Sequence, residues 1–351
     1  MTSHCADLDK DDQGLANQIE FWRGTKVMAE KRLDHVDDHM IVASADKAAE
    51  LYYSAPFELA DGGYALASVP PHVDLELTNV CDLACEFCET LVMKRKPGMM
   101  SLELFKKIID QCEAIGVKSC KINGWGESLL NKQLCNMVDH AKANSKLILQ
   151  FNTNANRLTP EISRRLISAG LDRLTVSIDG ITKETYEKLR VKGSYEDVFR
   201  NVHDLLEIKK QLNTNYPHLT VQIIRTTENA NEIEPFVEYW KNHADQVTVT
   251  NIGITVTESV LRFSMRERSA LGRKACEQPW QRLFVNWNGE VTVCCSDFDG
   301  ALAIGNIGET SLPDLWHGEK LSQLRRRHAA RDFDGLICKT CTETKRYSDG
   351  A

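Results

Sequence analysis

Three cysteines that lie close together in the sequence, Cys81, Cys85 and Cys88, have the spacing of a metal-binding loop. Thiolates separated by four and three residues can hold three irons of a four-iron four-sulfur cluster and leave the fourth iron open. The alternative is a structural zinc site, but such a site is closed by four ligands. The nearest cysteine or histidine outside the triplet is not at the spacing of a zinc knuckle. The sequence therefore favours an iron-sulfur cluster with one open iron.

A second set of cysteines lies toward the end of the chain and consists of Cys276, Cys294, Cys295, Cys338 and Cys341. Residues 283–293 alternate around an Asn-Gly pair, which predicts a two-residue hairpin. Such a hairpin can present one cysteine toward the final Cys-x-x-Cys pair, which makes four ligands for one closed cluster. Neighbouring strand residues point to opposite faces, so we expect only one of Cys294 and Cys295 to bind.

The region that carries the first triplet alternates strands and helices, a pattern typical of parallel α/β folds. The predicted strands are 73–78, 117–123, 147–152, 172–178, 219–225 and 246–252. The predicted helices are 102–115, 129–144, 160–169, 182–190, 195–211 and 232–243. The triplet follows the first strand, at the end where barrels of this kind place their sites.

Several of these strands alternate apolar and polar residues, although strands of a parallel sheet covered on both faces usually form apolar runs. Asp74 and Glu76 alternate with apolar residues in the first strand, and Gln150 and Asn152 do so in the third. If helices cover the apolar face, the polar face lines a lumen that water or ligand fills. We therefore predict an α/β fold with a partly open (β/α)6 barrel of the TIM type.

With these features the chain resembles the radical S-adenosylmethionine (SAM) enzymes from about residue 72 to 345. Their signature is a CxxxCxxC loop with an aromatic residue before the third cysteine, here Phe87. The resemblance implies that SAM binds the open iron and is held by residues at the ends of successive strands. The positions that match are Gly124, Gly126, Glu127, Asn154, Ser177, Asp179 and Arg190.

The resemblance also implies what each of these positions does. Glu127 and the backbone beside it would meet the amino group of SAM, although Trp125 departs from the family's Gly-Gly-Glu segment. Asn154 would lie near the ribose. The group of Ser177, Asp179 and Arg190 would meet the carboxylate and the ribose.

The C-terminal region resembles the twitch form of the SPASM extension of radical SAM enzymes, with Pro279-Trp280 and the 305–316 stretch as further points of likeness. This resemblance implies one auxiliary four-iron four-sulfur cluster with four cysteine ligands. They are Cys276, Cys294, Cys338 and Cys341, and Cys294 is preferred to Cys295. The implied cofactors are SAM and two four-iron four-sulfur clusters. The implied partner is an electron donor such as flavodoxin or ferredoxin.

The reaction implied by the family is reductive cleavage of SAM to a 5'-deoxyadenosyl radical, which takes a hydrogen atom from substrate. We favour a sugar or aminocyclitol carbinol from natural-product biosynthesis, antibiotics included, as the substrate. Asp74 and Glu76 can accept hydrogen bonds from its hydroxyl and ammonium groups. The alternative is that these carboxylates bond to backbone or to Lys121 and Asn123 across the lumen.

Two further residues are assigned to the chemistry. Arg262 is predicted to assist proton loss from a substrate hydroxyl. We favour dehydrogenation, with the auxiliary cluster as electron acceptor, over epimerisation in which Cys295 returns a hydrogen atom.

Two other functions stay open. One is a radical SAM maturase of ribosomally made peptides or of sulfatases, although residues 1–70 lack an obvious series of strands for catching a leader peptide. The other is a non-enzymatic zinc protein. Iron and sulfide analysis separates the zinc protein from both enzymes.

The 351 residues suffice for about two domains at ~150 residues each. We predict an N-terminal extension of unknown role over 1–70, with helical stretches at 15–32 and 44–53, a barrel over 71–255 and an auxiliary domain over 256–351. Net charge is -7 without a long basic block, so no nucleic-acid partner is expected. No apolar run approaches the ~18 residues of a membrane span, and the polar N-terminus lacks signal-peptide features. A cytoplasmic enzyme with reduced thiols is expected.

Overall fold

The computed structural model describes residues 39–43, 64–251 and 275–341 of the chain. Within them, ten strands form one sheet in the order β1-β7-β6-β5-β4-β3-β2-β8-β9-β10. The strands from β2 to β7 run parallel and stand in chain order, which gives the barrel part of the sheet. Their bounds are β2 His72–Leu75, β3 Ser119–Ile122, β4 Ile148–Thr153, β5 Arg173–Ser177, β6 His218–Arg225 and β7 Gln246–Asn251. The predicted α/β fold with six parallel strands is confirmed.

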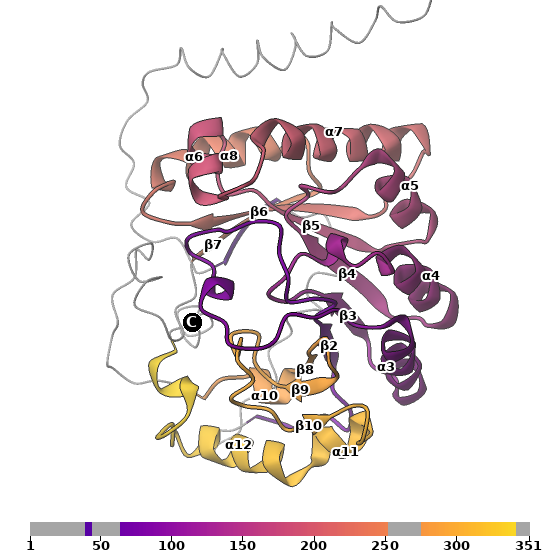
Figure 1. Cartoon of the computed structure of the whole chain (residues 1–351), viewed down its shortest axis with the longest axis vertical. Helices are drawn as coiled ribbons and strands as arrows, with labels where there is room; N and C mark the ends of the chain where they lie inside the picture. Colours follow the sequence, from indigo (N-terminus) through magenta and orange to yellow (C-terminus); the bar gives the residue numbers. More distant parts are fainter. Residues whose placement is uncertain (1–38, 44–63, 252–274, 342–351) are drawn as a thin grey trace, which may run out of the picture. The chain divides into compact units, whose positions relative to one another are not determined.

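The helices that connect these strands lie along the outside of the curved sheet (Figure 1). They are α3 Leu102–Ile115, α4 Leu134–Asn144, α5 Pro160–Ser168, α6 Lys183–Leu189, α7 Tyr195–Gln211 and α8 Ile233–Trp240. Hydroxyl side chains that cap the first turn set where four of them begin: Ser101, Thr159, Thr182 and Ser194 each accept a backbone N–H.

Helix α4 begins later than the predicted 129–144 stretch. A short 3-10 helix, η2 (Ser128–Leu130), takes the first residues instead. Asn131 then leaves the helical path, because its buried amide donates to the carbonyl oxygens of Leu77 and Met100 at 3.2 and 3.0 Å. That long-range contact overrides the local helical pattern.

The predicted polar face of the sheet is present. In β4 the side chains alternate between buried and half-buried, with Leu149 and Phe151 fully buried and Gln150 and Asn152 reached by solvent. Strand β6 alternates in the same way. The buried side chains pack beneath the helices, so the half-buried polar ones face the inside of the barrel.

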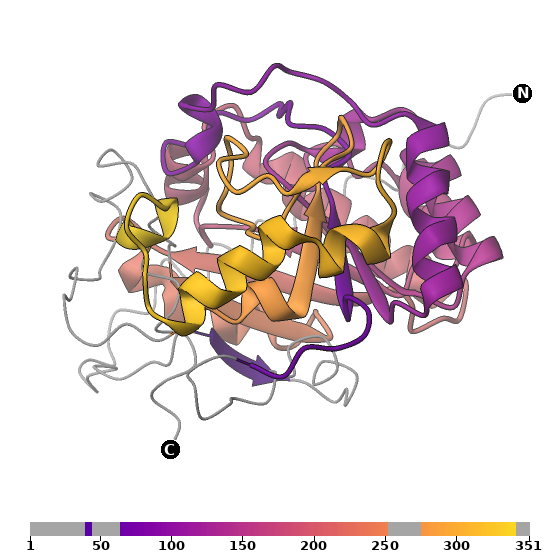
Figure 2. The ribbon, with the colours of Figure 1, turned by 90° about the horizontal axis from the view of Figure 1, so that it is seen from below.

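The C-terminal region continues the barrel's sheet. Strand β8 (Arg282–Val285) pairs parallel with β2, and β9 (Glu290–Thr292) and β10 (Gly305–Asn306) follow antiparallel. A hairpin joins β8 to β9 as predicted, but its loop has three residues, 287–289, instead of two, because Val285 pairs with Val291 and the Asn286 N–H donates to the Glu290 carbonyl at 2.8 Å. Gly289 takes the positive φ of 84° that such a loop requires. Helices α10 (Gln278–Gln281), α11 (Leu312–His317) and α12 (Glu319–Ala329) complete the region on the side of β8 and β9 (Figures 1 and 2).

The N-terminal region differs from the prediction at one point. Residues 39–43 form strand β1, which pairs antiparallel with β7 at the edge of the sheet. The predicted helices at 15–32 and 44–53 lie outside the described residues, as does the predicted boundary near 255. Everything described here belongs to the unit Asp37–Ala351. Across the described residues, no helix combines the length and the apolar character that a membrane crossing requires.

Candidate functional site

The cysteine triplet lies on the loop after β2 and is held by an apolar cluster. Leu83, Cys85, Phe87 and Leu189 are buried together, with Cys81, Cys88 and Ile224 packed against them. The backbone N–H of Leu83 donates to the Cys81 sulfur at 3.4 Å, and the Thr90 hydroxyl donates to the Cys88 sulfur at 3.1 Å. These donors suit sulfurs that carry negative charge.

Burial also bears on what this loop can bind. It raises the pKa of the Cys81 thiol to about 12 and raises the pKa of the Cys85 thiol as well. Such thiols ionise only when a cation compensates the desolvated charge, and a coordinated metal does so. The donor set therefore fits an iron-sulfur cluster.

Asp82, inside the triplet, ties the loop to the end of β4. Its carboxylate accepts hydrogen bonds from the side chains of Asn154 at 3.0 Å, Asn156 at 3.1 Å and Arg157 at 2.9 Å. Although burial alone would raise the pKa of Asp82, these three donors lower it. Sequence reasoning missed Asp82, because nothing local links it to partners more than 70 residues away. The Asn154 amide, predicted near the ribose, is thus bonded to the cluster loop.

The Gly-Trp-Gly-Glu segment follows β3 and packs tightly against β2. Gly124 has a φ of +143°, and a Cβ there would lie 2.8 Å from Cγ of Glu76. A Cβ on Gly126 would lie 2.4 Å from the carbonyl oxygen of Thr78. Both positions therefore require glycine. Trp125 is accommodated because its ring meets Phe298 of the C-terminal region edge to face, with centroids 5.6 Å apart.

Glu127 is buried at the end of this segment and points to the start of the loop after β4. Its carboxylate accepts from the backbone N–H groups of Leu129 (2.9 Å) and Asn154 (2.8 Å) and from the Thr153 hydroxyl (2.9 Å). Burial raises the pKa of Glu127 to about 7, although these three donors oppose the shift. A carboxylate has about four lone-pair sites, so a fourth donor such as an ammonium group can still be accepted.

Asp179 and Arg190, predicted to belong to one group that meets SAM, form a buried pair with each other. Nε of Arg190 donates to Oδ2 of Asp179 at 2.6 Å, and the other oxygen of Asp179 accepts the Ile224 N–H at 2.8 Å. The guanidinium lies 5.6 Å from the ring centroid of Phe87 on the cluster loop. Asp179 therefore orients Arg190 at the loop. Ser177 is half-buried on β5.

The two carboxylates of β2, predicted to face substrate, are paired with protein cations. The two terminal nitrogens of the Arg95 guanidinium donate to the two carboxylate oxygens of Glu76, at 2.8 and 2.6 Å. Asp74 lies 3.1 Å from Arg282 and 3.5 Å from His72. Although burial alone would raise the pKa of Asp74, the charges of His72 and Arg282 hold it well below its usual range. The alternative considered from the sequence is confirmed in part: the backbone N–H of Trp287 donates to Glu76 at 3.3 Å, and the charge of Lys121 adds to the lowering of the pKa of Asp74.

The half-buried polar face of the barrel carries a chain of neutral side chains. Gln150 donates to Oδ1 of Asn152 at 3.3 Å and to the Thr175 hydroxyl at 3.0 Å. Asn152 in turn donates to Oδ1 of Asn123 at 3.3 Å. This series of hydrogen-bonded side chains runs from the residue after β3, across β4, to β5. It presents amide and hydroxyl groups without net charge.

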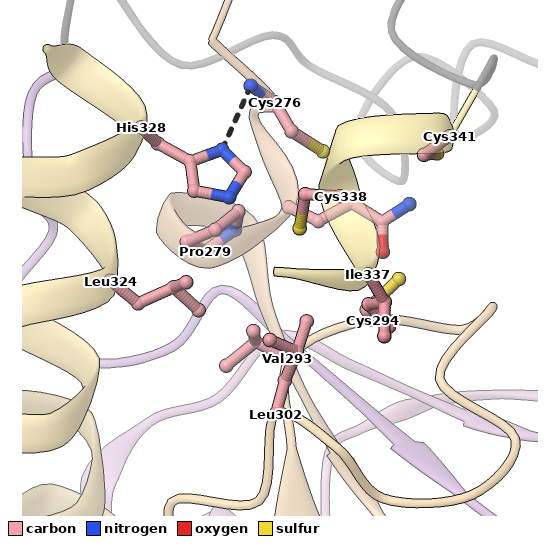
Figure 3. A pocket seen from close by; sticks show the side chains of 11 residues that line it. Cys276, Pro279, Val293, Cys294, Leu302, Leu324, His328, Ile337, Cys338 and Cys341 are labelled. Atoms are coloured by element: carbon pink, nitrogen blue, oxygen red, sulfur yellow. Dashed lines mark hydrogen bonds between the residues drawn. The ribbon is translucent and has the colours of Figure 1, made fainter. Parts of the chain in front are cut away.

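The C-terminal cysteines surround one pocket (Figure 3). Its lining includes Cys276, Cys294, Cys338, Cys341 and His328. Burial, together with the neighbouring cysteines, raises the pKa of Cys276 to about 12. Four thiols around one pocket fit a closed iron-sulfur cluster.

The structure distinguishes the two adjacent cysteines. Cys294 lines the pocket, whereas Cys295 is held by the side chain of Gln278. Nε2 of Gln278 donates to the Cys295 sulfur at 3.6 Å, and Oε1 of Gln278 accepts the Cys295 N–H at 3.3 Å. This arrangement favours Cys294 as the ligand.

His328 is a further residue of this pocket that sequence reasoning did not single out. It is buried on α12, and its Nδ1 accepts the backbone N–H of Cys276 at 3.3 Å. Because Nδ1 accepts, the ring proton lies on Nε2, which is turned toward the pocket (Figure 3). Arg262, predicted to assist proton loss, lies outside the described residues.

Comparisons with known proteins agree with this geometry. The family model of the radical SAM superfamily matches residues 75–240, and that of the SPASM iron-sulfur cluster-binding domain matches residues 276–342. The mycofactocin maturase MftC of Mycolicibacterium smegmatis is 28% identical over 177 residues, which are 50% of this chain and 43% of MftC. The chain thus spans less than half the length of that relative.

Two solved structures share the fold. SuiB of Streptococcus suis bound to its precursor peptide SuiA has a TM-score of 0.61 and 13% identity, over 97% of this chain and 83% of SuiB. BtrN in complex with AdoMet and 2-DOIA has a TM-score of 0.54 and 18% identity, over 80% of this chain and 96% of BtrN. At these identities the likeness shows the fold alone.

The two family models together cover the barrel and the cysteine-rich C-terminal region. Radical SAM domains bind SAM and a four-iron four-sulfur cluster, and SPASM domains bind auxiliary iron-sulfur clusters. The residues described above fit both kinds of group. The chain therefore carries a radical SAM domain over residues 75–240 and a SPASM iron-sulfur cluster-binding domain over residues 276–342.

Proposed function

We propose that this radical SAM enzyme is a maturase that modifies a peptide. This reverses the order of the two functions favoured from the sequence, where a sugar or aminocyclitol came first. The relatives support the change: MftC is named a maturase, and SuiB, which covers nearly the whole chain, was solved with its precursor peptide.

The geometry of the barrel supports the same conclusion. The sugar assignment depended on Asp74 and Glu76 being available to hydroxyl or ammonium groups, but both carboxylates are paired with arginine. What the barrel presents instead is the neutral chain of Asn123, Gln150 and Asn152. Side-chain amides match the donors and acceptors of peptide groups. The observation that carries the proposal is that the carboxylates of β2 are paired with arginine, while neutral amides stand on the half-buried face of the barrel.

The roles of the chain's own residues follow from their positions. Bound together, the open iron and SAM supply a 5'-deoxyadenosyl radical that takes a hydrogen atom from substrate. Glu127 would accept from the amino group of SAM, and Arg190, held by Asp179, would donate to its carboxylate. Asn154 and Ser177 would lie near the ribose. Cys276, Cys294, Cys338 and Cys341 would close the auxiliary site, which suits electron transfer better than substrate binding.

The proposal is tested by the substrate that stimulates SAM cleavage. The protein is reconstituted anaerobically and supplied with SAM, dithionite and either aminocyclitols or synthetic peptides translated from short reading frames beside its gene. We expect a peptide, and no aminocyclitol, to raise 5'-deoxyadenosine formation above the substrate-free rate and to lose hydrogen in its mass spectrum. Stimulation by an aminocyclitol alone would overturn the proposal.

Dehydrogenation or epimerisation of a sugar or aminocyclitol is the second candidate, and one observation favours it. The described part of the SPASM domain holds a single four-cysteine pocket, and BtrN, solved with 2-DOIA, is covered almost completely by this chain. Turnover in deuterium oxide separates its two outcomes. Oxidation leaves no deuterium at the reacting carbon, whereas return of hydrogen from the Cys295 thiol would leave deuterium there. The proton-transfer role of Arg262 is also part of this candidate.

A further inference from the structure

An exposed apolar patch follows the cysteine triplet directly. Within the described residues, six large apolar side chains are exposed, and three of them fall between residues 91 and 99. These are Leu91, Val92 and Met99, with exposed fractions of 57%, 43% and 47%. Exposed apolar side chains concentrated in one short segment are typical of a contact with another molecule.

The same segment carries two exposed lysines, Lys94 and Lys96. Neither forms an ion pair with any residue that the structure describes. Two acids lie nearby: Glu86 is exposed on the cysteine loop, and Asp299 accepts the backbone N–H of Lys94 at 2.7 Å. Both lysines are exposed, so this apolar segment carries positive charge on a chain of net charge -7.

The backbone of this segment is fixed by hydrogen bonds to neighbouring parts of the structure. The side chain of Arg95 is clamped by Glu76 and donates through Nε to the carbonyl oxygen of Phe298 at 2.6 Å. Asn79 donates to the Lys96 carbonyl at 2.9 Å and accepts the Gly98 N–H at 2.9 Å. The exposed side chains thus project from an ordered backbone, which lowers the entropy lost when a partner binds.

The segment also begins at the cluster. Cys88 immediately precedes η1 (Glu89–Leu91), and four residues of chain span at most about 14 Å, so Val92 lies no farther than that from the third cluster cysteine. Reductive cleavage of SAM consumes one electron, which must enter the cluster from outside the chain. Electron transfer is faster over a shorter distance. A carrier protein bound at this segment would lie close to the cluster cysteine Cys88.

We propose that the Leu91–Met99 segment is the docking surface for an acidic one-electron carrier protein of the flavodoxin or ferredoxin kind. The reduced carrier gives up one electron and leaves oxidised, and the cluster beside Cys88 gains it. A chain of net charge -7 repels an acidic carrier at long range, so Lys94 and Lys96 supply the local attraction, and Leu91, Val92 and Met99 supply the apolar contact. This inference rests on radical SAM chemistry and not on whether the substrate is a peptide.

The test compares two reductants on the holoenzyme. The charge-reversal variant Lys94→Glu/Lys96→Glu is assayed for 5'-deoxyadenosine formation, first with a purified bacterial flavodoxin kept reduced by its reductase and then with dithionite. We expect the flavodoxin-driven rate to fall about tenfold at low salt, because steering charges are reversed. The dithionite-driven rate is expected to stay unchanged, since this small reductant needs no docking surface.

A matched control carries the same change of charge elsewhere. Lys118 and Lys146 are exposed at the amino ends of β3 and β4, whereas the cluster loop follows the carboxyl end of β2. Lys118→Glu/Lys146→Glu should keep both rates.

Three results would overturn the inference. An unchanged flavodoxin-driven rate in Lys94→Glu/Lys96→Glu would mean that the carrier docks elsewhere. An equal loss in the control variant would mean that only overall charge matters. A loss that also appears with dithionite, in the presence of peptide substrate, would make the segment a peptide-binding surface instead.

Discussion

The buried pair of Asp179 and Arg190 leads to a sharp prediction, because only one member is expected to touch SAM. In Asp179→Asn the side chain keeps its shape and its acceptor for the Ile224 N–H, which lies at 2.8 Å. It loses the negative charge that fixes the guanidinium at 2.6 Å. Arg190 is then free to leave its place near Phe87.

The expected loss can be estimated from the bonds involved. A hydrogen bond to a charged group contributes roughly 1.5–3 kcal/mol, which corresponds to about ten- to a hundredfold in affinity. The dissociation constant for SAM should therefore rise at least about tenfold in Asp179→Asn. The iron content should not change, because neither residue binds iron.

The assay is anaerobic equilibrium binding of radiolabelled SAM to protein of known iron content. Arg190→Met should weaken SAM binding at least as much as Asp179→Asn. The double variant should be no weaker than Arg190→Met alone, since Asp179 acts through the arginine. Additive effects in the double variant would mean that Asp179 contacts SAM by itself, and unchanged binding in both single variants would refute the role of the pair.

Three further predictions follow from the two sites. Cys294→Ala should remove the iron of the auxiliary site and Cys295→Ala should keep it, as measured by iron analysis; the reverse result would exchange their roles. The pKa of Glu127 is raised to about 7, so its ionised fraction and the affinity for SAM should rise between about pH 6 and pH 8, whereas Glu127→Gln should show no such rise attributable to this residue. His328→Phe should lower the reduction potential of the auxiliary cluster in an EPR-monitored titration, because hydrogen bonds to cluster sulfurs raise it; an unchanged potential would contradict the placement of Nε2.

Much of the fold could be predicted from the sequence because its signals are local. Alternation of apolar residues placed the six parallel strands, and the Asn-Gly pair placed the hairpin that joins β8 to β9. The start of α4 was predicted too early, since Asn131 is fixed by carbonyl groups of Leu77 and Met100. Strand β1 was missed because its partner β7 lies some 200 residues away.

In the candidate site, too, local features could be predicted from the sequence and contacts between distant residues could not. The cysteines were found from their spacing, and the SAM residues from the family likeness. The partners of Asp74 and Glu76 could not be found, because the Asp74–Arg282 pair spans 208 residues and no periodicity links Glu76 to Arg95. Those pairs decide whether a carboxylate is available to substrate, so the preferred substrate class changed once they were known.

The central claim is that the first triplet holds a SAM-cleaving cluster separate from the auxiliary one. The most direct measurement determines iron, sulfide and 5'-deoxyadenosine in anaerobically reconstituted wild type and in the variant Cys81→Ala/Cys85→Ala/Cys88→Ala. We expect about eight irons per chain in the wild type, from two four-iron clusters, and about half of that in the variant, with no 5'-deoxyadenosine. Continued formation of 5'-deoxyadenosine by the variant, or zinc without iron in the wild type, would contradict the account.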